Sequence, residues 1–142
     1  HYDMATITAG EMKTEIMDVH KKVKELTGKD MKVFRPPYGS YNNELIDTVY
    51  GCDYYPIQWD VDSLDWKGIS ASEITKRVTG KVTNGSIVLF HNAGEHTPEA
   101  LPDILDYLLG EGYEIVPISK ILLTNEETYI DHTGRQCRSA ET

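Results

Sequence analysis

Short apolar runs alternate with amphipathic helical segments along this chain, and the alternation constrains the fold more than any other feature of the sequence. The clearest run lies at residues 86–90, where Gly85 precedes a continuous apolar segment. Runs of this kind are typical of parallel strands that are buried on both faces. Parallel strands need crossover connections, usually helices, so the alternation predicts an α/β fold with parallel strands. The pattern leaves open whether these strands form an open sheet or part of a (β/α) barrel.

Capping residues predict where the helices begin and end. Thr8 and Glu11 have the spacing of a capping box, and Gly28 is a stop signal after the apolar stripe that follows them. Further helices are expected to begin near residues 42, 70 and 97, and strands are expected at residues 31–34, 54–59, 86–90 and 113–118.

Size and charge bound the class of protein. The chain has 142 residues, which is enough for one domain with a hydrophobic core and too few for two. We expect a domain at residues 1–124 and a polar, loosely packed tail at residues 125–142. The net charge of −9 argues against nucleic acid and anionic lipid as partners, because both are bound through Lys and Arg. A neutral or cationic sugar polymer is compatible with it, and no apolar run approaches the ~20 residues of a transmembrane helix.

Three groups of polar residues follow predicted strands, at the carboxyl ends where α/β proteins build their active sites. They occupy residues 35–39 (Arg-Pro-Pro-Tyr-Gly), 62–66 (Asp-Ser-Leu-Asp-Trp) and 89–91 (Leu-Phe-His). Each group has a structural alternative: a surface arginine in a stiff loop, a capping aspartate beside a core tryptophan, or a hydrogen-bonded histidine at the rim of the sheet. Their joint presence at one edge favours a functional site.

The three groups resemble, in order and spacing, the last three of five motifs of the polysaccharide deacetylase family (carbohydrate esterase family 4, the NodB-homology domain). The resemblance covers about residues 1–118. It implies that the chain is the C-terminal part of that domain, which forms the second part of a distorted (β/α)7 barrel, and that the N-terminal part is missing. The family's first motif, usually Thr-Phe-Asp-Asp-Gly, is absent. His1 matches the second histidine of the family's His-x-x-x-His motif; the alternative is a tag remnant or an arbitrary start.

The resemblance implies a metal-dependent hydrolase that removes acetyl groups from a polysaccharide. Polymers of N-acetylglucosamine, such as peptidoglycan or chitin, are the expected substrates. The family holds a divalent metal, usually zinc, with one Asp and two His, and the metal polarises the acetyl carbonyl and the attacking water. His1 is the one metal ligand that this chain would supply, so its zinc site is expected to be incomplete.

The matched motifs also imply roles for the other site residues. His91 is expected to be the general acid that protonates the leaving group, and Asp65 to orient it. Arg35 would pair with the family's base Asp, which lies outside the matched motifs, and hold it in place. The remaining expectations are an oxyanion contact from the Tyr38 N–H group and an acetyl pocket walled by Trp66 and Leu89.

A rival interpretation is a non-catalytic carbohydrate-binding or interaction domain that kept the fold and lost the metal site. In either case a polysaccharide is the expected partner, and the family resemblance implies an extracellular or cell-surface location. Half a barrel would expose strand edges, so we expect a complementing segment or self-assembly.

The geometry of the site can be predicted as well. Arg35, Asp65 and His91 should lie at one edge of the sheet, because right-handed crossovers place successive strand ends together. The Asp65 carboxylate should lie within hydrogen-bond reach of the His91 ring, roughly 2.6–3.2 Å. Cys52 and Cys137 are expected to be free thiols, with a disulfide between them as the alternative. His20, His96 and His132 have no motif match and are expected to lie at the surface.

Overall fold

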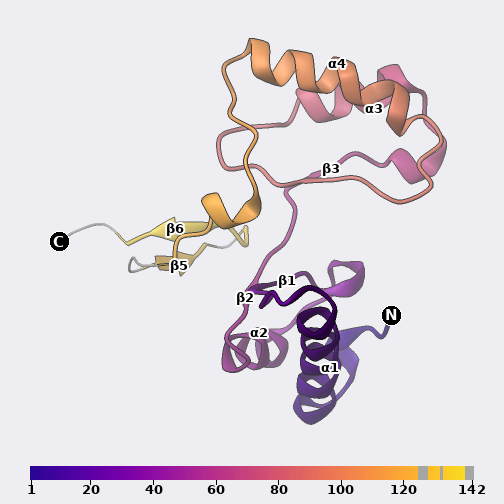
Figure 1. The fold of residues 1–142 in the computed structure, drawn as a ribbon. Helices are drawn as coiled ribbons and strands as arrows, with labels where there is room; N and C mark the ends of the chain where they lie inside the picture. The colour runs from indigo at the N-terminus through magenta and orange to yellow at the C-terminus, as the bar shows by residue number, and fades with distance from the viewer. Residues whose placement is uncertain (125–127, 132, 140–142) are drawn as a thin grey trace. The chain divides into compact units, whose positions relative to one another are not determined.

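A computed structural model describes residues 1–124, 128–131 and 133–139 of the chain (Figure 1). The chain divides into two compact units, residues 1–58 and residues 59–142. This division was not predicted from the sequence. The predicted domain boundary at residue 124 stays a prediction.

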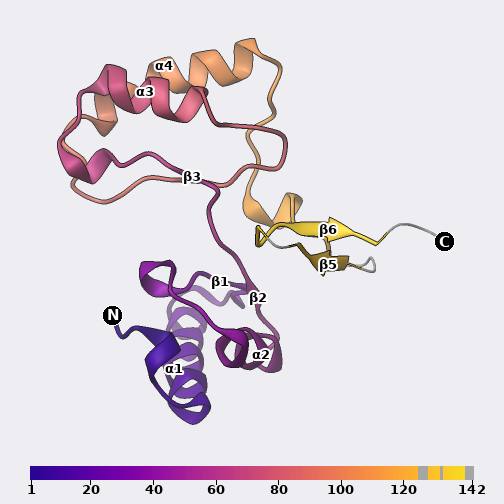
Figure 2. The ribbon, with the colours of Figure 1, turned by 180° about the vertical axis from the view of Figure 1, so that it is seen from behind.

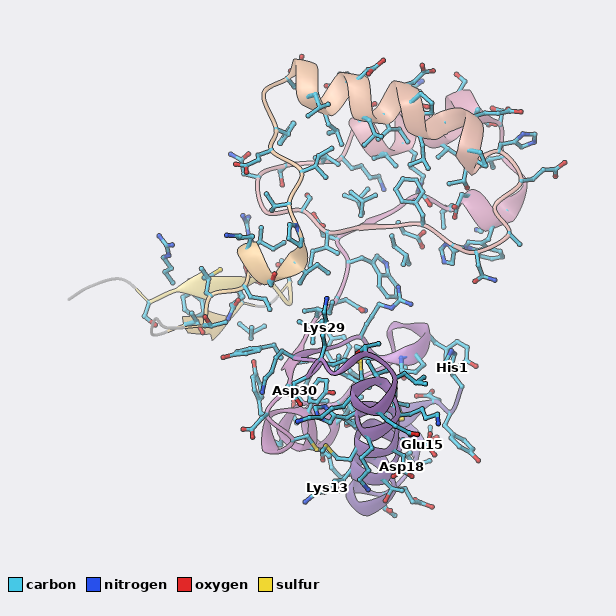
Figure 3. All side chains as sticks on the ribbon, in the orientation of Figure 1. His1, Lys13, Glu15, Asp18, Lys29 and Asp30 are labelled. Carbon is cyan, nitrogen blue, oxygen red and sulfur yellow. The ribbon has the colours of Figure 1, made fainter. Side chains whose placement is uncertain are left out.

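The first unit is built on two helices and one pair of parallel strands. The long helix α1 (Ala9–Thr27) begins with the predicted capping box, in which the Thr8 hydroxyl accepts from the Glu11 N–H group and the Glu11 carboxylate accepts from the Thr8 N–H group. It ends at Gly28, whose φ of 71° is the left-handed conformation that favours glycine. Both predicted helix boundaries are thereby confirmed. In Figure 3, Lys13, Glu15 and Asp18 project from this helix.

A short ladder and a second helix complete this unit. Strands β1 (Val33–Phe34) and β2 (Tyr55–Pro56) pair in parallel, with Val33 opposite Tyr55. Between them lie the 3-10 turn η2 (Pro37–Gly39) and helix α2 (Asn43–Gly51), whose first turn is capped by the Asn42 side chain at 2.9 Å from Leu45 N. A further 3-10 turn, η1 (Met4–Thr6), precedes α1. The core consists of Met4, Met12, Ile16, Leu45, Val49 and Tyr54.

The second unit repeats the pattern with a different core. Strands β3 (Val61–Asp62) and β4 (Val88–Leu89) pair in parallel, and helices α3 (Ala71–Thr79) and α4 (Thr97–Gly110) lie side by side in both views (Figures 1 and 2). The Asp60 carboxylate accepts from Ser86 Oγ at 2.6 Å and from Ile87 N at 2.7 Å, which fixes the register where the two strands begin. The core consists of Val61, Ile74, Val78, Ala100, Ile104 and Leu108.

The remaining elements differ most from the sequence prediction. Residues 113–118 do not form the predicted strand: the Tyr113 N–H group bonds back to Leu108 O, and the 3-10 turn η4 (Ile118–Lys120) follows. An apolar run becomes a strand only where a neighbouring backbone pairs with it, and within the described part of the chain none pairs with this run. The polar tail instead contains an antiparallel pair, β5 (Thr128–Ile130) and β6 (Gln136–Arg138).

The predicted α/β class with parallel strands is confirmed, although the strands are shorter than expected. Strand β3 was not predicted, because residues 60–66 were interpreted as a polar loop after the preceding strand. No helix within the described ranges is both long and apolar enough to cross a membrane.

Candidate active site

The second unit places Asp65 inside the protein at the end of a tight turn. The turn follows β3 and leads into the 3-10 turn η3 (Asp65–Lys67). Asp62 Oδ1 accepts from the Leu64 N–H group at 2.9 Å, a local bond that Asp side chains form readily, and Leu64 takes the left-handed conformation with φ 55°. The turn buries the Asp65 side chain completely, with 0% of its surface exposed. A buried carboxylate needs hydrogen-bond donors, and the next strand supplies them.

His91 lies against this carboxylate. The pairing of Asp62 with Leu89 brings the end of β4 beside the turn, so His91 comes within reach two residues later. The His91 ring contacts Asp65 with 2.8 Å between Nδ1 and Oδ1, and the His91 N–H group lies 3.2 Å and 3.1 Å from the two carboxylate oxygens. The predicted hydrogen bond between Asp65 and the His91 ring is therefore confirmed. The His91 side chain is 31% exposed, so its ring reaches solvent although the Asp65 carboxylate that it contacts is buried.

Asp65 is held as an anion. Burial is the strongest single influence and raises the pKa of its carboxyl group. Hydrogen bonds from the Thr97 hydroxyl, from the N–H group and ring of His91 and from Ser63 act in the opposite direction, and together they lower the pKa below its ordinary value. An ionised carboxylate can only accept, so the proton of this hydrogen bond belongs to His91 Nδ1.

An aromatic surface adjoins the histidine. The Trp66 side chain is 57% exposed, and its ring centroid lies 6.2 Å from that of His91 in an edge-to-face arrangement. The Lys67 ammonium group lies 5.3 Å from the Trp66 ring centroid. Leu89, by contrast, belongs to β4 and is only 9% exposed. The exposed face of Trp66 is the kind of surface on which the apolar face of a sugar ring can stack.

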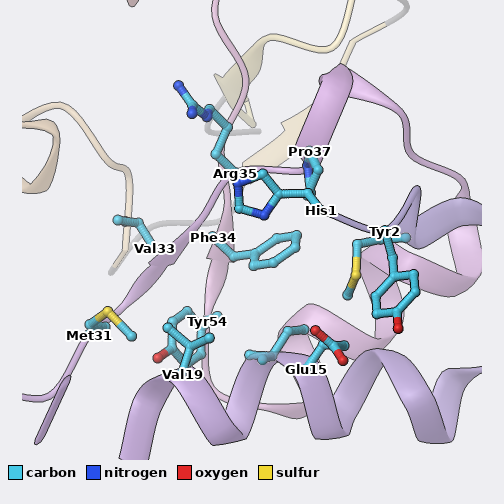
Figure 4. A pocket seen from close by; sticks show the side chains of 12 residues that line it. His1, Tyr2, Glu15, Val19, Met31, Val33, Phe34, Arg35, Pro37 and Tyr54 are labelled. Atoms are coloured by element: carbon cyan, nitrogen blue, oxygen red, sulfur yellow. The ribbon is translucent and has the colours of Figure 1, made fainter. Parts of the chain in front are cut away.

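The other candidate residues belong to the first unit. Arg35 follows β1, and the two prolines after it lead to Tyr38, whose φ of 61° is rare for a residue other than glycine. The Tyr38 hydroxyl donates to the His1 carbonyl at 2.9 Å. A pocket of about 580 Å³ opens beside them, and His1, Arg35, Phe34 and Glu15 are among the residues that line it (Figure 4).

The structure thus groups the predicted residues by unit. Asp65, Trp66, Leu89 and His91 lie together in the second unit, whereas His1, Arg35 and Tyr38 lie in the first. The convergence of Arg35 with Asp65 and His91 stays a prediction.

The donor set does not fit a complete metal site in this chain. His1 is the candidate ligand, and a catalytic zinc needs three protein ligands. Among residues 1–124, 128–131 and 133–139, no three His, Cys, Asp or Glu side chains gather closely enough to hold an ion.

Sequence reasoning missed two hydrogen-bond partners. Thr97 was interpreted only as the start of a helix, yet its hydroxyl donates to Asp65 Oδ2 at 2.6 Å. His20 was predicted to be a surface residue; that was wrong, because its side chain is only 17% exposed and bonds to Tyr54 and Asp30. A polar residue in a helix does not reveal from the sequence which distant polar group tertiary packing will bring to it.

The remaining predictions concern residues outside the site. His96 is partly exposed and pairs with Glu99 at 3.4 Å, while Cys52 and Cys137 are free thiols. The prediction for His132 lies outside the described residues.

Comparison with known proteins agrees with the motifs. Residues 1–57 match the sequence model of the family described as polysaccharide deacetylase. The chain is 30% identical to a peptidoglycan-N-acetylglucosamine deacetylase of Bacillus cereus, over 89% of this chain and 48% of that protein. It is 34% identical to a peptidoglycan-N-acetylglucosamine deacetylase of Listeria monocytogenes, over 85% of this chain and 25% of that protein. The chain therefore spans about half, or less, of the length of these relatives.

Solved structures share the fold. A peptidoglycan N-acetylglucosamine deacetylase in complex with a substituted benzamide superposes with a TM-score of 0.82 at 28% identity, over 88% of this chain and 60% of that one. A carbohydrate esterase family 4 pseudoenzyme from Bacillus anthracis gives 0.79 at 28% identity, over 85% of this chain and 43% of that one.

The fold defines the class: an α/β protein with the fold of solved carbohydrate esterase family 4 proteins. The family predicted from the sequence is confirmed, and the chain belongs to the polysaccharide deacetylases, of whose domain it covers a part.

Proposed function

We propose that the protein removes acetyl groups from a polysaccharide, with a polymer of N-acetylglucosamine such as peptidoglycan or chitin as the substrate. The observation that carries this proposal is the buried, ionised Asp65 that holds His91 Nδ1 at 2.8 Å while the ring stays partly exposed. Its support comes from two relatives that act on N-acetylglucosamine in peptidoglycan. Such a substrate would place the protein outside the cell or on its surface.

The geometry suits His91 to the role of general acid. Because Nδ1 donates to Asp65, Nε2 is the nitrogen that can take up and release a second proton. In the reaction, the oxygen of water forms a bond to the acetyl carbon, the base Asp of the family takes one proton from that water, and the carbon–nitrogen bond breaks. The proton on Nε2 passes to the leaving amine, and acetate and a free amino sugar are the products.

The remaining roles follow the family motifs. Trp66 offers an exposed aromatic face to the sugar and Leu89 an apolar wall to the acetyl methyl group. The Tyr38 N–H group is the proposed oxyanion donor, and Arg35 the proposed partner of the base Asp.

Zinc is the proposed cofactor, with His1 as one of its ligands. Bound zinc would supply Lewis-acid polarisation of the acetyl carbonyl. Since the described residues bring no second and third ligand to His1, the complete set would need side chains from a complementing segment or from another copy of the chain. Such a complement is also the proposed protein partner.

A second candidate is a non-catalytic carbohydrate-binding or interaction domain. The specific support for it is the likeness to a family 4 pseudoenzyme of Bacillus anthracis, which shows that this fold also occurs without activity. The pseudoenzyme reading predicts binding of the polymer without release of acetate.

An activity panel separates the two. The protein in its full native length is incubated with N-acetylglucosamine oligomers and with acetylated xylan, and acetate is measured with and without added zinc. The His91→Ala variant is the matched control. Release of acetate that depends on His91 supports the hydrolase, whereas oligomer binding without acetate release under all conditions supports the non-catalytic domain.

A further inference from the structure

The Asp65 carboxylate is enclosed by donors that arrive from two different elements. Its Oδ1 atom receives the His91 ring at 2.8 Å and the His91 N–H group at 3.2 Å. Its Oδ2 atom receives the same N–H group at 3.1 Å and the Thr97 hydroxyl at 2.6 Å. All the bonds to Oδ1 therefore come from the strand end that carries His91, and the short bond to Oδ2 comes from helix α4.

Thr97 is fixed by the helix that it begins. It is the first residue of α4, and its N–H group bonds to Gly94 O at 3.3 Å. Further along the same helix, Ala100 and Ile104 lie in the core and are at most 2% exposed. The packed backbone of α4 thus fixes the position of the Thr97 hydroxyl. The His91 ring, which Thr97 reaches only through Asp65, is partly exposed.

Gly94 shows how tightly this corner is built. A Cβ atom placed on Gly94 would lie 2.8 Å from Asp65 Oδ2 and closer still to the Thr97 hydroxyl. Carbon atoms do not approach these oxygens so closely, so any larger residue would displace the hydroxyl or the carboxylate. The loop after His91 can pass here only because residue 94 has no side chain.

We propose that Thr97 is a positioning residue, which holds the Asp65 carboxylate in the one orientation that aligns the His91 ring. A carboxylate can rotate about the bond to its side chain, and a bond from Thr97 to one oxygen leaves the other oxygen directed at Nδ1. Hydrogen bonds from a hydroxyl to a carboxylate at this distance are among the strong ones. The catalytic consequence rests on the proposed deacetylase function, but the alignment of His91 does not.

Two other ionisable side chains near the site, His96 and Lys67, have different partners. His96 pairs with Glu99 on α4, and Lys67 lies over the Trp66 ring. Changes at Thr97 should therefore reach His91 through Asp65.

The test compares Thr97→Val, which keeps the shape and removes the hydroxyl, with Thr97→Ser, which keeps the hydroxyl and removes the methyl group. The first measurement needs no activity: the resonance of the His91 Nδ1–H proton is followed by NMR in the full native protein. In Thr97→Val, we expect this proton to exchange faster with solvent, because a misaligned carboxylate no longer holds it in a strong hydrogen bond. Thr97→Ser should resemble the wild type.

The second measurement is kinetic. We expect Thr97→Val to lower kcat by roughly 10- to 100-fold with little change in KM, since small misplacements of a catalytic group have costs of this order. Thr97→Ser should stay within about 3-fold of the wild type on the same argument. If Thr97→Val does not fold, Thr97→Ala takes its place in both measurements.

The two measurements distinguish a failure of the proposed role of Thr97 from a failure of the proposed deacetylase function. An unchanged exchange rate of the His91 Nδ1–H proton in the folded hydroxyl-free variant would overturn the role of Thr97. Faster exchange in a protein that releases no acetate would support the role of Thr97 and count against the deacetylase function alone.

Discussion

Each unit of the molecule contains one histidine bonded to one aspartate, and the two pairs are built in opposite ways. In the second unit the carboxylate of Asp65 is wholly buried and the His91 side chain is 31% exposed. In the first unit the carboxylate of Asp30 is 46% exposed and the His20 side chain only 17%. The nitrogen–oxygen distances, 2.8 Å and 3.1 Å, hardly differ. Burial of the aspartate, and not the contact itself, distinguishes the pairs.

The ring nitrogens show what the difference means for chemistry. Both nitrogens of His20 are engaged, Nε2 by Asp30 and Nδ1 by the Tyr54 hydroxyl at 2.7 Å. For His91 only Nδ1 is engaged within the described parts of the chain. A histidine with one nitrogen anchored and the other available can transfer a proton, whereas a histidine anchored at both nitrogens holds two elements together. The first pattern is typical of a catalytic residue and the second of a structural one.

The strongest test of this contrast exchanges each histidine for alanine in the full-length native protein. His91→Ala should lower kcat by roughly 10²- to 10⁴-fold, the usual contribution of a positioned general acid. His20→Ala should leave kcat within about 3-fold, because the residue transfers no proton in the reaction. Acetate release under saturating substrate measures both. Equal effects of the two substitutions on kcat would break the comparison.

The aspartates should differ in the same direction but less strongly. Asp65→Asn should reduce kcat by less than His91→Ala does, because the His91 ring loses the buried carboxylate that orients it. Asp30→Asn should leave kcat unchanged. If Asp65→Asn keeps the wild-type kcat, Asp65 does not assist His91.

The loss of folding stability at acid pH provides a third comparison of Asp65 with Asp30. Burial acts to raise the pKa of Asp65, but its hydrogen bonds prevail and lower it below the ordinary value of 3.8. The ionised carboxylate therefore stabilises the fold above that value, and the contribution is lost as the pH falls through the lower pKa of the folded state. Urea unfolding between pH 2 and pH 6 should show a wild-type decrease at the acid end that is smaller in Asp65→Asn.

Asp30 is the control for this measurement. The hydrogen bond from Lys24 is the main cause that lowers its pKa, and the group lies at the surface. Exposed ion pairs contribute little to stability, so Asp30→Asn should change the acid decrease less than Asp65→Asn does. The reverse order would contradict the assignment of Asp65 as the buried partner.

A smaller effect is expected where Tyr54 meets His20. Tyr54→Phe removes the hydroxyl that bonds to His20 Nδ1 and leaves the ring, which is 4% exposed, in the core. The free energy of unfolding should fall by about 1 kcal/mol, the usual value for one hydrogen bond, and kcat should not change. A loss of activity at unchanged stability would give the His20 pair a role in the reaction.

The smallest effect is expected when zinc is added to the chain. His1 is the one metal ligand that the family motifs assign to this chain, and a single histidine cannot hold zinc tightly. Calorimetry on the 142-residue chain should show no tight one-to-one binding. Sub-micromolar binding would contradict this expectation, and loss of that binding in His1→Ala but not in His20→Ala would locate the site.

The sequence by itself determined the features that depend on near neighbours. The ends of α1, the caps at Thr8 and Asn42 and the α/β class follow from residues within one turn or one run of each other. The hydrogen bond between Asp65 and His91 could also be predicted, because parallel strands joined by a crossover bring their carboxyl ends to one edge of the sheet. Motif spacing then gave the family.

Tertiary structure alone decided the features that depend on distant backbone and on burial. Residues 113–118 have the composition of a strand but lack a paired neighbour in the described structure, while Val61–Asp62 became a strand because Val88–Leu89 lies beside it. Thr97, 32 residues from Asp65, and Tyr54, 34 residues from His20, found their partners through packing. A sequence records which groups can form hydrogen bonds, but burial selects the pairs that must form them, since a buried polar group without a partner costs more than the bond contributes.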